Sequence, residues 1–183
     1  MRHLIYGINL TIDGYCEHTQ LPGSAEIHEY FTDLLAKTDL AIYGRKTYDL
    51  MVPYWPDVAK APTGDKAIDR FAQIFNGIEK IVCSRTRTDF EGNPRVLHDN
   101  LTEQIMALKQ APGKDISIGG VTLPGELIKL GLVDEFYFVV HPVLGGQGRK
   151  LLDGANLPEQ LSLTLADATT LASGCMALHY VKQ

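Results

Sequence analysis

The chain contains little cysteine and no dense cluster of metal-binding side chains. The three cysteines, Cys16, Cys83 and Cys175, are too few and too widely spaced for a disulfide framework or a metal knuckle. We therefore expect thiols that form no disulfide, in a reducing compartment. No ligand spacing relates the histidines to one another, so we expect no metal site; those considered are His3, His18, His98, His141 and His179.

The chain also lacks a run of basic residues and a long apolar stretch. Its net charge of -5 comes from acids and bases scattered along the sequence, which argues against a nucleic-acid-binding surface. No Lys/Arg cluster suggests an anionic membrane partner, and no apolar run approaches the roughly 20 residues that a membrane-spanning helix needs. The residues after Met1 have no signal-peptide cleavage pattern. We expect a cytoplasmic protein.

Apolar runs alternate with helical patterns through most of the chain. A length of 183 residues suits one domain, spanning 1–183, and is slightly short for two. Strands are predicted at residues 3–9, 39–43, 79–84, 94–97, 115–119, 133–141, 160–167 and 175–182. Helices are predicted at 24–37, 65–76, 101–110 and 121–131, the third beginning with a capping box of Asn100 and Glu103. Strands that alternate with helices indicate an α/β fold with parallel pairing.

The pattern changes after residue 132. Three strands follow with no helix between them, which predicts antiparallel strands at one edge of a mostly parallel sheet. A glycine-rich loop, Leu144–Asn156, separates the first two, and Pro53–Asp65 is the other long loop. The apolar run Phe136–Val140 has no alternating polar residues, so both of its faces need cover. Because no helix protects the last strands, we expect pairing with a second copy, and hence a homodimer.

A pair of glycines follows the fifth predicted strand. Ile118 leads into Gly119 and Gly120, and a helix begins at once with Leu123 and Leu127 at helical spacing. Glycine lets the backbone come close to a bound group, and a helix start offers unpaired N–H groups to a phosphate. A tight turn without a ligand is the alternative interpretation.

Two further strand exits carry groups that suit an anion. After the second strand, Gly44 precedes Arg45, Lys46 and Thr47, and cations at a helix start oppose the helix dipole unless an anion is present. After the third strand, Ser84–Thr88 alternates hydroxyls with guanidiniums, which suit a phosphate monoester. A solvated turn is the alternative at each exit. Because the carboxyl ends of parallel strands share one edge, a molecule with a pyrophosphate and a separate phosphate fits the three exits together.

The chain resembles the dihydrofolate reductase superfamily, and most closely its branch that contains the reductase domain of bifunctional riboflavin-biosynthesis proteins. The resemblance runs nearly end to end and rests on the order and spacing of short segments. These segments are Asn9–Gly14, Gly44–Tyr48, Ser84–Arg85, Ile118–Gly120 and His141–Gly148. The resemblance implies a three-layer dihydrofolate-reductase-like fold and an NADPH cofactor.

The resemblance also implies which residues hold the cofactor. The segments matching Gly44–Thr47 and Gly119–Thr122 would hold the pyrophosphate from two helix starts, and the positions matching Arg45, Ser84 and Arg85 would hold the 2′-phosphate. The loop Leu10–Pro22 matches the segment that covers the nicotinamide. The implied cofactor residues are Gly7, Ile8, Gly14, Gly44, Arg45, Lys46, Thr47, Ser84, Arg85, Ile118, Gly119, Gly120, Val121 and Thr122.

Fewer residues are implied on the substrate side. Asn9 is expected to contact the substrate, and Trp55 either contacts it as a wall of the pocket or anchors its loop at the surface. Asp13 either caps its loop or contacts the substrate, and it is also a candidate catalytic residue. His28 stands where a classical folate reductase has a carboxylate that supports protonation of the ring. Glu29 beside it is the candidate catalytic acid, and a solvated helix face is the alternative for this residue.

The leading interpretation is an NADPH-dependent reductase that transfers a hydride to a pyrimidine- or pterin-type compound. The activity most like it is that of the 5-amino-6-(5-phosphoribosylamino)uracil reductase of riboflavin biosynthesis. A dihydrofolate reductase-type activity and a non-catalytic NADPH-binding protein are the alternatives, and the missing helix carboxylate favours the second. Neither a G-x-x-x-x-G-K-[ST] loop for phosphoryl transfer nor a Rossmann G-x-G-x-x-G is present. Arg149 and Lys150 either meet a substrate phosphate or lie on a solvated turn.

Overall fold

The computed structural model describes residues 1–16, 21 and 23–183. The strands are β1 (Leu4–Thr11), β2 (Thr38–Gly44), β3 (Glu79–Cys83), β4 (Arg95–Leu97), β5 (Asp115–Gly119), β6 (Glu135–His141), β7 (Leu163–Thr170) and β8 (Met176–Lys182). The helices are α1 (Ala25–Ala36), α2 (Arg45–Met51), α3 (Trp55–Lys60), α4 (Lys66–Gly77), α5 (Leu101–Gln110) and α6 (Thr122–Lys129). Within the described ranges, every helix is too short or too polar to span a bilayer.

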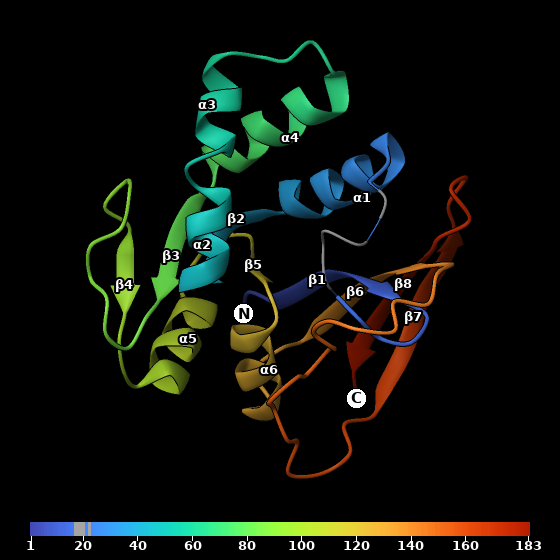
Figure 1. Cartoon of the computed structure of the whole chain (residues 1–183). Coiled ribbons are helices and arrows are strands. Elements are labelled where there is room, and N and C mark those ends of the chain that lie inside the picture. Colours follow the sequence, from blue (N-terminus) through green and yellow to red (C-terminus); the bar gives the residue numbers. More distant parts are fainter. Residues whose placement is uncertain (17–20, 22) are drawn as a thin grey trace.

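All the strands form one sheet, in the order β4-β3-β2-β5-β1-β6-β8-β7. Neighbours from β4 to β6 run parallel, whereas β6 with β8 and β8 with β7 pair antiparallel. Figure 1 shows the antiparallel strands gathered at one end of the sheet. The predicted α/β fold with an antiparallel C-terminal edge is confirmed.

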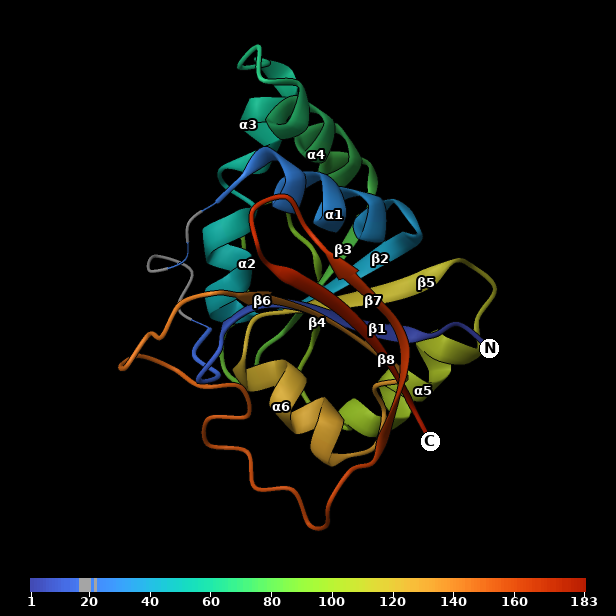
Figure 2. The same cartoon turned by 90° about the vertical axis from the view of Figure 1, so that its right-hand side faces the viewer.

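Helices cover both faces of the sheet and make three layers. Figure 2 shows α1 to α4 on one face and α5 and α6 on the other. On the α5 and α6 side, Leu4, Ile42 and Ile116 pack with Leu127 of α6 in the larger buried cluster. The other face is rich in aromatic residues, because Tyr43 packs there with rings from α4. Both faces of the parallel strands are therefore buried, which explains their nearly continuous apolar runs.

Two predictions about helices are wrong. The segment Pro53–Asp65, expected to be a loop, contains α3, whose Trp55 ring lies 4.4 Å from the ring of Phe71 in α4. Proline is tolerated in a first helical turn because the N–H groups there have no helical partner, so Pro56 does not exclude a helix. Asn100 does not cap α5 through its side chain; its backbone lies in the left-handed region, at φ 45°.

The antiparallel edge is tied to α1 by one carboxylate. Glu26, in the first turn of α1, accepts hydrogen bonds from the backbone N–H groups of Ala172 (2.8 Å) and Ser173 (3.2 Å). These two residues lie in the turn between β7 and β8. β7 itself forms the end of the sheet and is exposed along most of its length, with Leu165 at 52% exposure.

Candidate functional site

The three strand exits that suit an anion lie side by side at the carboxyl edge of the sheet. In the register of β2 with β3, Gly44 is the partner of Cys83, which directly precedes Ser84. In the register of β2 with β5, Tyr43 is the partner of Gly119. The segments that follow β3, β2 and β5 are therefore neighbours, as the parallel pairing predicted.

The diglycine turn after β5 packs against the start of α2. Gly120 has a φ of 91°, and a Cβ built there would lie 2.4 Å from the Oγ1 of Thr47. A Cβ at Gly119 would lie 2.9 Å from the ring of Tyr43. From the other side, the Tyr6 hydroxyl donates a hydrogen bond to the carbonyl oxygen of Gly120 (2.9 Å). Both glycines are thus required by the turn itself, whether or not a ligand lies beside it.

Two helices begin at this corner without a side-chain cap. Gly44 precedes α2 and Val121 precedes α6, and neither helix start has a side-chain cap hydrogen bond. Ser24 caps α1 and Asp65 caps α4, whereas α3 and α5 also have no side-chain cap hydrogen bond. The starts of α2 and α6 adjoin, because a Cβ at Gly44 would lie 3.6 Å from the Cβ of Leu123. Their open N–H groups leave the positive ends of two helix dipoles available to an anion.

The basic side chains near this corner fall into two groups. Arg45, Lys46 and Arg85 are exposed and have no ion-pair partner in the part of the chain that the structure describes. Arg87 forms an ion pair within the chain, because its Nη1 donates to both carboxylate oxygens of Asp49 at 2.8 and 3.0 Å. Arg87 thereby fixes the segment after β3 against α2, while Arg85 stays available.

The loop after β6 brings another arginine to the start of α6. Arg149 donates from Nη2 to the Oγ1 of Thr122 at 3.1 Å, and its Nε lies 3.6 Å from an oxygen of Asp153. Lys150 lies over the ring of Tyr15, with Nζ 4.8 Å from the ring centre. The Arg149 side chain therefore lies at a helix start predicted for the cofactor, and a contact with a substrate phosphate stays a prediction.

The Asp13 carboxylate joins its own turn to the loop after β6. Its carboxylate accepts hydrogen bonds from the backbone N–H groups of Gly145 (2.9 Å) and Gly146 (3.0 Å) and from the Thr11 hydroxyl (2.6 Å). The Thr11 hydroxyl and these N–H groups hold the pKa of Asp13 well below its ordinary value, so the carboxylate is ionised at neutral pH. The loop-capping interpretation is confirmed. Nothing in these contacts supports Asp13 as a proton donor.

The remaining predicted cofactor residues lie along β1, at the end of β5 and in the first loop. Gly7 lies under α1, where a Cβ would come within 3.0 Å of Leu34, and Ile8 packs with the cluster on the opposite face. Ile118 is buried, and Gly14 has the φ of 83° that its turn needs. Residues 17–20 and 22 of the predicted loop, including His18, lie outside the described residues. Within the described ranges, no group of three or more His, Cys, Asp or Glu residues is arranged to hold a metal ion.

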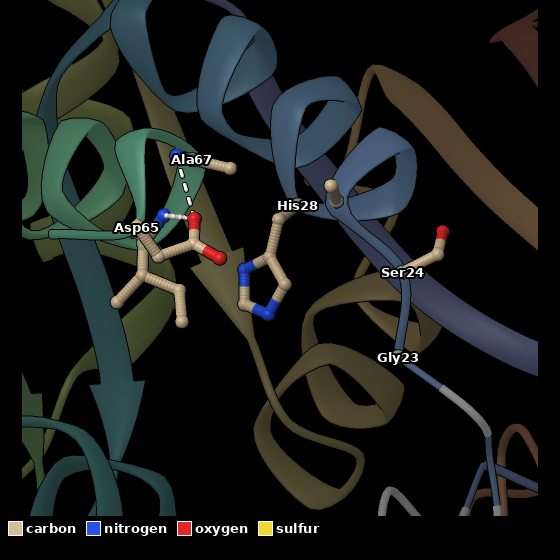
Figure 3. Close-up of a pocket in the computed structure, with 7 residues that line it drawn as sticks. Gly23, Ser24, His28, Asp65 and Ala67 are labelled. Carbon is tan, nitrogen blue, oxygen red and sulfur yellow. Dashed lines mark hydrogen bonds between the residues drawn. The ribbon is translucent and has the colours of Figure 1, made fainter. Parts of the chain in front are cut away.

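A cavity of about 270 Å³ lies between the first turns of α1 and α4 (Figure 3). The residues that line it are Gly23, Ser24, Ala25, His28, Asp65, Ala67 and Ile68. The His28 ring is edge-on to the rings of Trp55 and Phe71, at centroid distances of 6.3 and 6.2 Å. Trp55, predicted to contact the substrate or to anchor its loop, packs edge-on against His28 and is not among the residues that line this cavity. Glu29 is exposed on α1, as in the solvated-face alternative.

Asn9 is bonded to a histidine that sequence reasoning did not assign to the site. The Nε2 of His141 lies 3.0 Å from the Oδ1 of Asn9, and the His141 side chain is 1% exposed. Its Nδ1 is buried and has no hydrogen-bond partner among the described residues. Burial lowers the pKa of His141, so the ring is neutral at pH 7. Because the Asn9 oxygen can only accept, the proton is on Nε2.

Residues 2–177 match the RibD C-terminal domain. The chain belongs to the RibD C-terminal domain family. The uncharacterized protein YyaP of Bacillus subtilis (strain 168) is 32% identical over 183 residues, which cover 98% of this chain and 94% of that protein. Membership in the RibD C-terminal domain family points to a reductase, and reductases of this kind generally bind a nicotinamide cofactor.

Solved structures of RibD-like proteins share the fold. A putative riboflavin biosynthesis protein from Shewanella sp. PV-4 aligns with a TM-score of 0.75 at 20% identity, over 99% of each chain. A pyrimidine reductase-like protein from Corynebacterium diphtheriae aligns with a TM-score of 0.70 at 15% identity, over 100% of this chain and 92% of that one. RibD from Acinetobacter baumannii aligns with a TM-score of 0.68 at 15% identity, and the match spans 58% of its chain. The dihydrofolate-reductase-like fold expected from the sequence is confirmed.

Proposed function

We propose that this member of the RibD C-terminal domain family is an NADPH-dependent reductase that transfers a hydride to a pyrimidine-type ring. The reaction would be like the reduction of 5-amino-6-(5-phosphoribosylamino)uracil in riboflavin biosynthesis. The observation that carries the proposal is the corner where α2 and α6 begin. There, two helix starts without side-chain caps adjoin Arg45, Lys46 and Arg85, which have no ion-pair partner among the described residues. A pyrophosphate and a separate phosphate complement this arrangement.

The residues at the corner suit NADPH in charge. The N–H groups of the first turns of α2 and α6 would bind the pyrophosphate, with the Arg149 guanidinium beside them. Arg45 and Arg85 would bind the 2′-phosphate. Ser84 would join them, because its hydroxyl oxygen accepts from the Arg87 N–H (3.0 Å) and leaves its proton to donate. When bound, NADPH supplies the hydride.

On the substrate side, the chain orients the ring and manages the proton. His141 fixes the Oδ1 of Asn9, which leaves the amide N–H groups of Asn9 to donate toward a bound molecule. His28 lines the cavity, where its ring nitrogens can form hydrogen bonds with a bound molecule. Rigid placement of the substrate against the cofactor is the main contribution we assign to the protein, because it removes the entropic cost of alignment.

The test is NADPH oxidation with candidate substrates. Loss of NADPH absorbance is followed with an aminopyrimidine ribitol- or ribose-phosphate and, in parallel, with dihydrofolate. Oxidation with the pyrimidine and not with the folate is the expected result. Oxidation with dihydrofolate alone would favour the folate-type alternative. Equal affinities for NADPH and NADH by calorimetry would contradict the assignment of NADPH.

One observation favours a second candidate, a protein that binds NADPH without turning it over. The carboxylate that supports ring protonation in a classical folate reductase is replaced by His28, and Glu29 is exposed. Tight NADPH binding, with no oxidation for any pyrimidine or pterin tried, is the result that this candidate requires. Steady oxidation with one substrate rejects it.

We also propose that the chain works in the cytoplasm as a homodimer with a small-molecule substrate. The exposed strand β7, with Leu165 on its surface, is an unprotected sheet end of the kind that pairs with another chain. Two-fold pairing is the commonest closed solution. Light scattering at micromolar concentration should report twice the 20.2 kDa mass of one chain. A mass of one chain would contradict the dimer.

A further inference from the structure

Near its carboxyl end, β1 is joined to β6 by a pair of polar side chains. The Nε2 of His141 lies 3.0 Å from the Oδ1 of Asn9, and His141 is 1% exposed. We propose that this pair determines which chemical group is accepted beside β1: an uncharged carbonyl oxygen rather than an amino group. That the oxygen belongs to NADPH or to the compound that it reduces rests on the function proposed above.

Asn9 lies on the α1 side of the sheet. Side chains alternate along a strand, so Asn9 shares a face with Gly7, where a Cβ would lie 3.0 Å from Leu34 of α1. Its register partner in β6 is Val139, which packs in one buried cluster with Ile27 from the first turn of α1. The amide nitrogen of Asn9 has no hydrogen-bond partner among the described residues, and it is not buried. Its N–H groups are therefore open to a bound molecule.

The polar atoms of His141 do little for the fold. Its Nδ1 is the one buried side-chain nitrogen or oxygen without a hydrogen-bond partner in the described part of the chain. A buried polar atom that stays unpaired lowers stability, so an apolar side chain of similar size would suit the fold better. The one hydrogen bond that the ring makes there is to Asn9. A residue that lowers stability and bonds only to a side chain of the site serves the site rather than the fold.

The pair holds Asn9 as a hydrogen-bond donor. The carboxamide oxygen of Asn9 can only accept, so it binds the Nε2–H of His141 and leaves the amide nitrogen free. Turning the amide over would set two N–H groups against each other, unless the ring proton moved to Nδ1. That move would bury an N–H group without an acceptor. Asn9 therefore complements a carbonyl oxygen and repels an amino group, and His141 is the positioning residue that maintains this preference.

The test titrates four probes into the full chain and follows the NMR signals of the Asn9 amide and of the His141 ring nitrogens. Acetophenone and aniline are flat single rings, of which the first only accepts a hydrogen bond and the second mainly donates one. The 3-acetylpyridine analogue of NADP⁺ carries a ketone in place of the carboxamide. The fourth probe, 2′-phospho-ADP-ribose, lacks the nicotinamide ring. The two nucleotides show whether the carbonyl oxygen comes from the cofactor or from a second compound.

Four variants separate positioning from a structural role. Asn9→Asp is the main variant, because aspartate can still accept from His141 but has no amide donor. Asn76→Asp is the matched control: it makes the same substitution at an exposed position of α4. His141→Leu removes the ring N–H, and His141→Gln keeps a donor for the Asn9 oxygen.

We expect the His141 proton on Nε2, and acetophenone to bind about fivefold more tightly than aniline, which is the difference for one uncharged hydrogen bond. Asn9→Asp should reverse this preference, and Asn76→Asp should keep it. In His141→Leu the amide can adopt both orientations, so the two probes should bind within about twofold of each other. His141→Gln should retain more of the preference. Urea unfolding should show His141→Leu to be no less stable than the parent, whereas a structural role requires lower stability with the preference intact.

The proposal is overturned if the His141 proton is on Nδ1, if aniline binds the parent as well as acetophenone does, or if His141→Leu keeps the full preference. Asn9 signals that move with the acetylpyridine analogue, but not with 2′-phospho-ADP-ribose, would support the proposal with the oxygen on the cofactor. Movement with acetophenone alone would support it with the oxygen on a second compound. Binding of both nucleotides without a preference for acetophenone would overturn this inference and leave the proposed reductase standing. The preference without any nucleotide binding would reject the reductase and keep the pair.

Discussion

The amino edge of the sheet pairs its charged side chains within the chain. Buried Lys109 contacts the carboxylate of Asp134 at 2.7 Å. Glu135, nearby at the start of β6, accepts hydrogen bonds from His3 and from His179, the second at 2.7 Å. These pairs join the ends of β1, β6 and β8 to one another and to α5. The charges at this edge serve the fold.

The carboxyl edge differs. Arg45, Lys46 and Arg85 are exposed there, and no ion pair engages them among the described residues. Open α/β sheets bind their ligands at this edge, so cations left unpaired there are available to an anionic group of a ligand. The comparison predicts a separation: substitutions at the amino edge should lower stability without changing cofactor affinity, and those at the carboxyl edge should do the reverse.

The largest effect should come from the amino edge. Lys109→Met should lower the free energy of unfolding by about 3 kcal/mol, because the Asp134 carboxylate loses the cation that compensates its partial burial. Urea unfolding measures the change. NADPH affinity, measured where the variant is still folded, should equal that of the parent chain. An unchanged unfolding midpoint would mean that the pair of Lys109 and Asp134 does not contribute to the stability of the fold.

The turn at Gly119 and Gly120 tests whether stability and cofactor affinity separate fully between the two edges. This turn lies at the carboxyl edge, but the fold needs it as well. The sequence alone predicts that valine at Gly119 or Gly120 abolishes cofactor binding without unfolding the protein. With Thr47 and Tyr43 in contact, we instead expect Gly120→Ala to cost about 2 kcal/mol of stability as well as cofactor affinity. Unfolding and calorimetry on the same sample measure both. A variant of unchanged stability that no longer binds the cofactor would support the prediction made from the sequence alone.

Arg85→Ala should show the carboxyl-edge behaviour alone. Losing a charge-assisted contact costs about 1.5–3 kcal/mol, so NADPH affinity should fall about tenfold or more. NADH affinity and stability should stay nearly unchanged, because NADH lacks the 2′-phosphate. Arg95→Ala is the matched control: Arg95 is also exposed, but it lies in β4 opposite Ile81, before the strand ends. Equal losses in the two variants would point to a general charge effect.

The smallest effect is a pH dependence at the amino edge. The hydrogen bond to Glu135 raises the pKa of His3 above its ordinary value of 6.5. The protonated ring therefore stabilises the fold below about pH 6.5, and this contribution is lost as the pH rises through the higher, folded-state pKa. Since His3 is half exposed, the change should stay below about 1 kcal/mol. Unfolding from about pH 5.5 to about pH 8.5 should show a decline in the parent that is absent in His3→Gln.

The sequence was sufficient for the sheet because its signals are local. Apolar runs with helical patterns between them marked the parallel strands, and the loss of helices after residue 132 marked the antiparallel edge. The helix α3 was missed because the prolines of the segment Pro53–Asp65 resemble loop signals, although Pro56 is in a first helical turn, where proline is allowed. The predicted side-chain cap at Asn100 was wrong for a similar reason, since asparagine is common both at helix caps and in the left-handed backbone region.

The candidate site was predictable where its residues are adjacent in sequence. Gly44 with Arg45, and Ser84 with Arg85, each place a strand end beside anion-binding groups. Contacts between distant segments gave no such signal. The hydrogen bond between His141 and Asn9 joins residues 132 positions apart, and no local sequence pattern predicts it. The placement of Asp65 opposite His28 depends on how α4 packs on α1, which only the folded chain shows.

Glu26 links the outer hairpin, β7 and β8, to the first turn of α1. The carboxylate holds the turn between β7 and β8, while Ser24 and His28, within a turn of it on the same helix, line the cavity. A second copy that docked on β7 would therefore bias the position of His28 without touching the cavity. Occupancy of the cavity and association of the chains would then be linked equilibria, each altering the other by the same factor. The apparent affinity of the cavity for a bound molecule would then depend on protein concentration.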